Sequence, residues 1–137
     1  MTTSTIEYAL GVGTGDGYDI TEIQSIAAWQ DAGFMNQNYN VFVKYLGEID
    51  FDPTALTTVT YQPSPSNGST KVNVTDDSGF LASGIEAIKF EFLATDGNAA
   101  GSIYREIDVM GSTTVPEPTT TALLGLGGLA LILRRRK

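Results

Sequence analysis

The chain has 137 residues, with 8 Lys+Arg against 16 Asp+Glu and a formal net charge of −8, which is enough sequence for one domain. It contains no Cys and no His, which excludes a disulfide framework, a Cys nucleophile, the usual zinc sites and every His-based general base. The acidity argues against a nucleic-acid partner, because phosphate contacts need a basic surface.

The start of the chain does not resemble an export signal. Residues 1–7 read Met-Thr-Thr-Ser-Thr-Ile-Glu, whereas a signal peptide needs a basic stretch followed by an apolar run. Because the C-terminal features described below make sense only in an exported protein, we expect the natural N-terminus to lie upstream of Met1. The N-terminal signal peptide is then not present in this chain.

Residues 1–111 are predicted to form an all-β domain, because apolar and polar side chains alternate at a period of two. The alternating segments are 6–10, 18–28, 40–45, 59–61, 71–75, 88–92 and 103–109. In the second segment Ile20, Ile23 and Ile26 lie three apart, which fits either a helical turn or a bulged strand, and their β-branching favours the bulged strand. About seven short strands are typical of an antiparallel β-sandwich or a barrel.

The order of several segments between residues 18 and 111 resembles a known domain. The matching runs are Tyr18–Ile23, Trp29, Asn38–Tyr45, Gly84–Phe92 and the closing Tyr104–Gly111. In this order they are similar to a discoidin-like domain of the galactose-binding-like group. The resemblance implies a jelly roll that binds glycans or other surface ligands. The opening strands and loops of that family, which often form its ligand site, are absent or shortened here.

Trp29 and Arg105 are the first candidates for ligand contacts. Trp29 is the only Trp and is followed by the polar residues Asp31, Asn36 and Gln37, so it either fills the core or stacks on a sugar while its neighbours bond hydroxyl groups. Arg105 falls by alternation on the apolar face of its segment, where a charge needs a partner or an exit to water. We therefore expect Arg105 to lie at a strand end or at the mouth of the sandwich, and the ligand residues to be Trp29, Asp31, Asn36 and Arg105.

Acidic residues offer two further hypotheses. Glu48, Asp50 and Asp52 are either a solvated acidic face or, as a weaker alternative, ligands for Ca²⁺, since hard cations prefer carboxylate oxygens. Glu106 and Asp108 lie two apart and share one strand face, so they are candidates for a carboxylate-based glycan hydrolase. In a small domain without His, we expect that no enzyme is present and that these residues are polar surface.

The C-terminus changes character in three steps. Residues 112–118 have the composition of a linker and contain Pro116-Glu117-Pro118, residues 119–133 carry no charge, and residues 134–137 are Arg-Arg-Arg-Lys. As a helix, 15 residues span roughly 22 Å, which is short of a bilayer core of about 30 Å. A buried core helix is the alternative, but this segment has no polar face. We predict a short C-terminal transmembrane helix with a cytoplasmic basic tail.

This arrangement resembles the PEP-CTERM sorting signal of Gram-negative bacteria. The resemblance rests on Pro116, Glu117 and Pro118, then a short apolar segment, then Arg134, Arg135 and Arg136. It implies recognition by exosortase, a membrane protease, which processes the chain near Pro116-Glu117-Pro118. It also implies a precursor inserted in the inner membrane and a final place at the cell surface or in the extracellular polysaccharide matrix.

Together these features predict an exported surface protein whose body is a structural, adhesive or weakly carbohydrate-binding β-sandwich. A fragment of a secreted hydrolase is the alternative. Ice binding is a third possibility, because the same C-terminal motif is named in ice-binding proteins. That function needs a long, flat threonine array, and the run Thr57-Thr58-Val59-Thr60 is too short to supply one.

Overall fold

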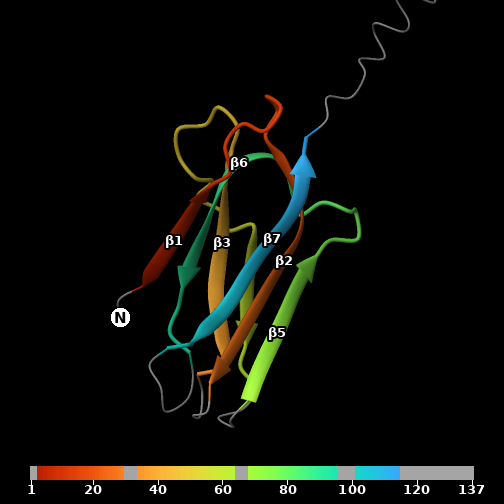
Figure 1. Ribbon diagram of the computed structural model, residues 1–137. Coiled ribbons are helices and arrows are strands. Elements are labelled where there is room, and N and C mark those ends of the chain that lie inside the picture. Colours follow the sequence, from red (N-terminus) through yellow and green to blue (C-terminus); the bar gives the residue numbers. More distant parts are fainter. Residues whose placement is uncertain (1–2, 30–33, 64–67, 96–100, 115–137) are drawn as a thin grey trace, which may run out of the picture.

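A computed structural model describes residues 3–29, 34–63, 68–95 and 101–114 of the chain. Within these ranges lie seven strands: β1 (Ser4–Ala9), β2 (Tyr18–Trp29), β3 (Gln37–Tyr45), β4 (Thr57–Tyr61), β5 (Gly68–Thr75), β6 (Ala82–Phe92) and β7 (Tyr104–Thr113). All pairings between these strands are antiparallel. The predicted all-β, antiparallel class is therefore confirmed (Figure 1).

The strands form one continuous sheet that folds over on itself. On one side, β4, β3, β6 and β1 lie next to one another in that order, and on the other β2 pairs with both β5 and β7. The two parts join where Tyr18 and Ile20 of β2 pair with Ile85 and Ala82 of β6. The result is a sandwich-like, nearly closed arrangement, in which Figure 1 shows β7, β2 and β5 side by side.

The core lies between the two parts and follows the predicted alternation. In β3 and β6, Val41, Val43, Ile88 and Phe90 are buried, while side chains between them, such as Lys89, are only partly covered. Successive side chains of a strand point to opposite faces, so one face of each strand is available for the core. Further buried apolar side chains come from the other strands, namely Ile20, Ile23, Val59, Ala82 and Ile85.

The bulged strand predicted for residues 18–28 is confirmed. Ile20 pairs with Gly111 and Glu22 with Met110, so Thr21 is an extra residue in β2 that has no partner in β7. An extra residue changes which side of the sheet the next side chains face. Ile20 and Ile23, three apart in sequence, are consequently both buried in the core.

The predicted C-terminal elements lie outside the described residues. This holds for residues 115–118 of the predicted linker, for the helix predicted over residues 119–133 and for the basic tail at residues 134–137. The linker was predicted to begin at residue 112, but Ser112 and Thr113 pair with β2 as the last residues of β7. In the described part of the chain, no helix has the length and apolar character needed to cross a membrane.

Candidate functional site

Trp29 and Arg105 meet at one end of the sandwich. Trp29 is the last residue of β2 and its side chain is 43% exposed. The guanidinium carbon of Arg105, near the start of β7, lies 5.1 Å from the centre of the Trp29 ring. The Nε–H of Arg105 also donates to the carbonyl oxygen of Ala28 at 3.1 Å. The structure thus brings two of the predicted ligand residues into direct contact on the surface.

Arg105 faces outward because β7 contains a bulge at this position. Ala27 pairs with Tyr104 and Ile26 with Glu106, which leaves Arg105 without a register partner. Strict alternation had placed Arg105 on the apolar face and Tyr104 on the opposite one. The bulge shifts the alternation by one residue, so that prediction of the face is wrong, whereas the predicted position near a strand end is correct.

Tyr104, which the bulge turns inward, fixes the start of β7 against the core. Its ring lies 4.8 Å from that of Phe92 and 5.9 Å from that of Tyr39, measured between centroids. Its hydroxyl accepts a hydrogen bond from the backbone N–H of Asn38 at 3.2 Å. Burial raises the pKa of Tyr104 from 10.0 to about 12, because the charged phenolate loses its hydration.

Alkaline pH is expected to destabilise the domain through Tyr104. The folded-state pKa is raised, so the stabilisation is complete below the unfolded value near 10 and is lost as pH rises through about 12. Chemical denaturation at several pH values should show unfolding becoming easier across this interval. The Tyr104→Phe variant should show a shallower decline, and Tyr61→Phe, at an exposed position, should behave as the parent. Equal slopes in all three proteins would contradict the prediction.

The other predicted ligand residues are placed differently. Asp31 lies outside the described residues. Asn36 is 3% exposed, and its backbone carbonyl accepts a hydrogen bond from the hydroxyl of Ser102. Gln37 is fully buried. The surface available to a ligand among the described candidates is therefore the Trp29–Arg105 pair.

A buried polar cluster, which sequence reasoning missed, lies in the core. Ser25 Oγ donates to Gln37 Oε1 at 2.5 Å and lies 2.8 Å from the Tyr39 hydroxyl. Gln37 Nε2 donates to the Thr70 hydroxyl at 2.9 Å and to its carbonyl oxygen at 3.2 Å. The sequence contains a signal for this cluster. Ser25 lies two residues after Ile23 and Gln37 two residues before Tyr39, so both polar residues fall in phase with residues of the core. The cluster links β2, β3 and β5.

The burial of this cluster also affects the Tyr39 phenol. Desolvation raises the pKa of Tyr39, and its hydrogen bond to Ser25 partly opposes that rise. Buried polar groups are stable only when their hydrogen bonds are made. The cluster therefore ties β2 to β3 across the core, a few residues before the β2 end that carries Trp29.

The acidic segment between β3 and β4 lines a groove that includes Glu48, Asp50 and Asp52. Within the described residues, no three acidic side chains are grouped closely enough to hold a metal ion. Asp52 accepts a hydrogen bond from the backbone N–H of Thr54 at 2.8 Å. Glu48 and Asp50 are exposed, and the solvated face and the weaker Ca²⁺ alternative both stay predictions.

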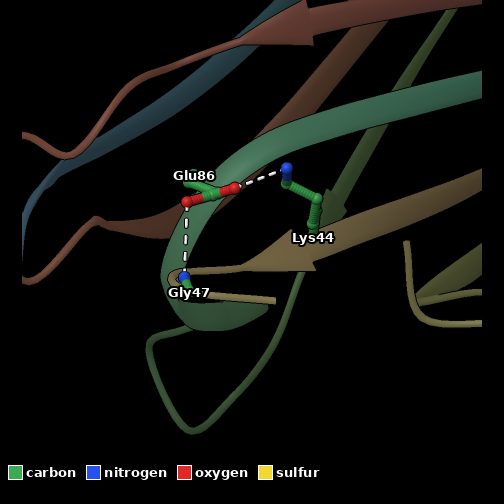
Figure 2. Close-up of polar contacts among 3 residues, drawn as sticks. All are labelled: Lys44, Gly47 and Glu86. Atoms are coloured by element: carbon green, nitrogen blue, oxygen red, sulfur yellow. Dashed lines mark hydrogen bonds and ion pairs between the residues drawn. The ribbon is translucent and has the colours of Figure 1, made fainter. Parts of the chain in front are cut away.

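Glu86, just beside this segment, has a structural role. Figure 2 shows its carboxylate between Lys44 and Gly47. Lys44 Nζ lies 2.6 Å from Glu86 Oε1, and the Gly47 N–H donates to Glu86 Oε2 at 3.4 Å. The hydrogen bond from Lys44, followed by that from Gly47, lowers the pKa of Glu86. These contacts join the end of β3 to β6.

The candidate residues for hydrolysis lie on β7, and the threonine run considered for ice binding lies on β4. Glu106 is exposed and Asp108 is partly buried on β7. On β4, Thr58 donates to the Asn40 side chain at 2.8 Å and Thr60 to that of Asn38 at 3.2 Å. The hydroxyls of Thr58 and Thr60 are thus engaged with β3.

Thr114 is held at the end of the sandwich opposite Trp29. Its N–H donates to the Gly17 carbonyl at 2.9 Å, and its hydroxyl donates to Asp19 Oδ1 at 2.8 Å. The Thr14 hydroxyl donates to the Thr114 carbonyl at 3.3 Å. We call these contacts of Thr114 with Thr14, Gly17 and Asp19 the Thr114 anchor. Because Thr113 pairs with Tyr18 while Tyr104 pairs with Ala27, the anchor and the Trp29–Arg105 pair lie at opposite ends of β2.

These observations define a small antiparallel all-β domain with an exposed Trp–Arg pair at one end and the Thr114 anchor at the other. The family described as the PEP-CTERM protein-sorting motif matches residues 114–137. The predicted sorting motif is therefore confirmed. It indicates a membrane-associated precursor that exosortase, a membrane protease, recognises, and a protein exported to the cell surface.

The body of the domain has no such counterpart. No curated protein matches the chain, and no solved structure matches it. The all-β class stands on the structure itself. The resemblance of residues 18–111 to a discoidin-like jelly roll remains a prediction.

Proposed function

We propose that the body is a non-enzymatic carbohydrate-binding or adhesive module, displayed at the cell surface or in an extracellular polysaccharide matrix. The observation that supports this is the Trp29–Arg105 pair. A half-exposed indole provides an apolar face on which a sugar ring can stack, and a guanidinium provides several N–H donors for hydroxyl or carboxylate groups. Both residues belong to strand ends that the core holds in place.

The position of the pair also supports this proposal. β2 spans roughly 36 Å at about 3.3 Å per residue, with Trp29 at one end and the Thr114 anchor near the other. A chain held to a surface through its C-terminus would present the Trp29–Arg105 pair away from that surface. One ring and one cation make a small contact, so each contact is weak, and a repeating polysaccharide would be bound through several copies.

The proposal predicts that Trp29→Ala lowers the affinity for a polysaccharide about tenfold, which corresponds to about 1.4 kcal/mol. The measurement is retardation of the full chain in native gels that contain neutral or uronic-acid polysaccharides. Arg105→Ala should weaken binding most with the uronic-acid polymers, because it removes the cation. Phe80→Ala is the matched control, since Phe80 is also an exposed aromatic residue and lies near the other end of β2.

Two results would contradict the proposal. One is equal retardation of the parent and of Trp29→Ala, which would place binding elsewhere. The other is the absence of retardation by every polysaccharide tested. Incubation with the bound polymer should leave its chain length unchanged, and the appearance of new reducing ends would instead favour the hydrolase alternative with Glu106 and Asp108.

A further inference from the structure

The sorting motif begins inside the folded domain. Thr114, the first residue of the matched segment, is held by Gly17, Asp19 and Thr14, and only Val115 separates it from Pro116. We propose that Thr114 must leave this anchor before exosortase can cleave the chain, and that Asp19 thereby controls the rate of processing. Asp19 is in this view a positioning residue, which acts on the substrate segment and not on the cleavage chemistry.

The main-chain groups at the end of β7 are engaged in the fold. A protease that binds its substrate as an extended strand uses the substrate's main-chain N–H and C=O groups. Here Thr113 is paired with Tyr18, and the N–H and carbonyl of Thr114 are bonded to Gly17 and Thr14. The last described residues before Pro116-Glu117-Pro118 are therefore bonded within the folded domain. Local opening of the strand end is needed to free their main-chain groups for a protease.

The Thr114 anchor is tightly packed around Gly17. Gly17 is buried with a positive φ of 79°, and a Cβ there would lie 2.8 Å from the carbonyl carbon of Gly84. This tight packing fixes the Gly17 carbonyl that receives the Thr114 N–H. Asp19 Oδ1 accepts from both Ser83 and Thr114, and these bonds lower the pKa of Asp19, that from Ser83 most. The carboxylate is thus ionised and aligned when it binds Thr114.

The experiment follows cleavage of the full chain in membranes that contain exosortase, read as the initial rate of the mass shift. Asp19→Ala removes the acceptor for Thr114 and is expected to raise the rate about three- to tenfold, as expected for loss of a charge-assisted hydrogen bond. Ser83→Ala is the matched control, because it removes a different donor to Asp19 and leaves the bond from Thr114. Its rate should stay within about twofold of the parent.

A spacer separates this effect from a change in stability. Four Gly/Ser residues inserted between Thr114 and Val115 supply free chain while the anchor stays intact. The spacer chain should be cleaved faster than the parent, and Asp19→Ala should then add nothing. A purely structural role of Asp19 would change the rate equally with and without the spacer.

Three outcomes would overturn the inference. The first is an unchanged or slower rate for Asp19→Ala in a chain whose thermal unfolding shows a folded body. The second is a spacer chain that is cleaved no faster than the parent. The third is the same acceleration by Asp19→Ala in both backgrounds. The test does not depend on carbohydrate binding, so failure of the proposed ligand site leaves it intact.

Discussion

Replacing Gly111 with alanine is expected to lower the free energy of unfolding by about 3 kcal/mol. Gly111 pairs with Ile20 beside the bulge at Thr21, and a Cβ at this position would lie 2.1 Å from the carbonyl oxygen of Asp19. That oxygen belongs to the backbone, so no side-chain rotation can relieve the overlap. Relief requires β7 to move away from β2, at the cost of strand pairing next to the bulge.

Urea denaturation of the full chain measures the free energy of unfolding, and thermal unfolding provides a second measure. A loss of about 3 kcal/mol should lower the urea midpoint, and should lower the melting temperature by more than 10 °C in a domain of this size. Ser112→Ala is the control, because Ser112 is exposed on the same strand and such changes usually stay within about 0.5 kcal/mol. Equal midpoints for Gly111→Ala and Ser112→Ala would show that the two strands are not packed this closely.

Gln37→Met is expected to cost about 2–4 kcal/mol, although methionine has a similar volume. Gln37 is fully buried, and its amide bonds both Ser25 and Thr70. Methionine offers neither a strong donor nor a strong acceptor, so polar groups on β2 and β5 lose their partner inside the core. The same denaturation experiment measures the loss.

The control for Gln37→Met is Asn73→Met, at an exposed position of β5. This variant also replaces a side-chain amide with methionine, but at a position that is not buried. It should change the free energy of unfolding by no more than about 0.5 kcal/mol. If Gln37→Met were as stable as the parent, the hydrogen bonds of the buried cluster would make no net contribution to the free energy of unfolding, and Gln37 would act only by filling space.

The strand content follows from the sequence because alternation is a local signal. The periods in β3 and β6 place Val41, Val43, Ile88 and Phe90 on the buried face, as the structure has them. The spacing of Ile20 and Ile23 indicated the bulge in β2, since two buried residues three apart need an extra residue between them. Hydrophobic patterning alone carries this information.

Burial on β1 and the orientation of Arg105 could not be predicted in the same way. Ile6 and Tyr8 alternate as core residues do, yet both remain exposed on β1, which pairs with β6. Its place in the sheet depends on pairing with a distant segment, which one strand's pattern does not reveal. The bulge at Arg105 likewise interrupts an alternation that looks regular in sequence.

For the candidate site, the sequence indicated residue types but not their assembly. Trp29 and Arg105 were chosen for the chemistry of an aromatic ring and a cation. Their contact depends on the register between β2 and β7, which are far apart in the chain. Asn36 was chosen by its closeness to Trp29 in sequence, and the fold buries it. Closeness in sequence to Trp29 is therefore a poor guide to which residues share its surface.

The pairing of β2 with β7 has a consequence for the timing of folding. Tyr18 pairs with Thr113 although almost the whole sequence of the domain lies between them. Such pairing forms slowly, because the intervening chain must first be closed into a loop. One layer lacks its β7 edge until the last residues of the body have emerged. The body can therefore complete its fold only after β7 has emerged, which is the point at which the sorting segment begins to follow. A chain that crosses a membrane from its N-terminus would stay without its final strand for nearly the entire passage.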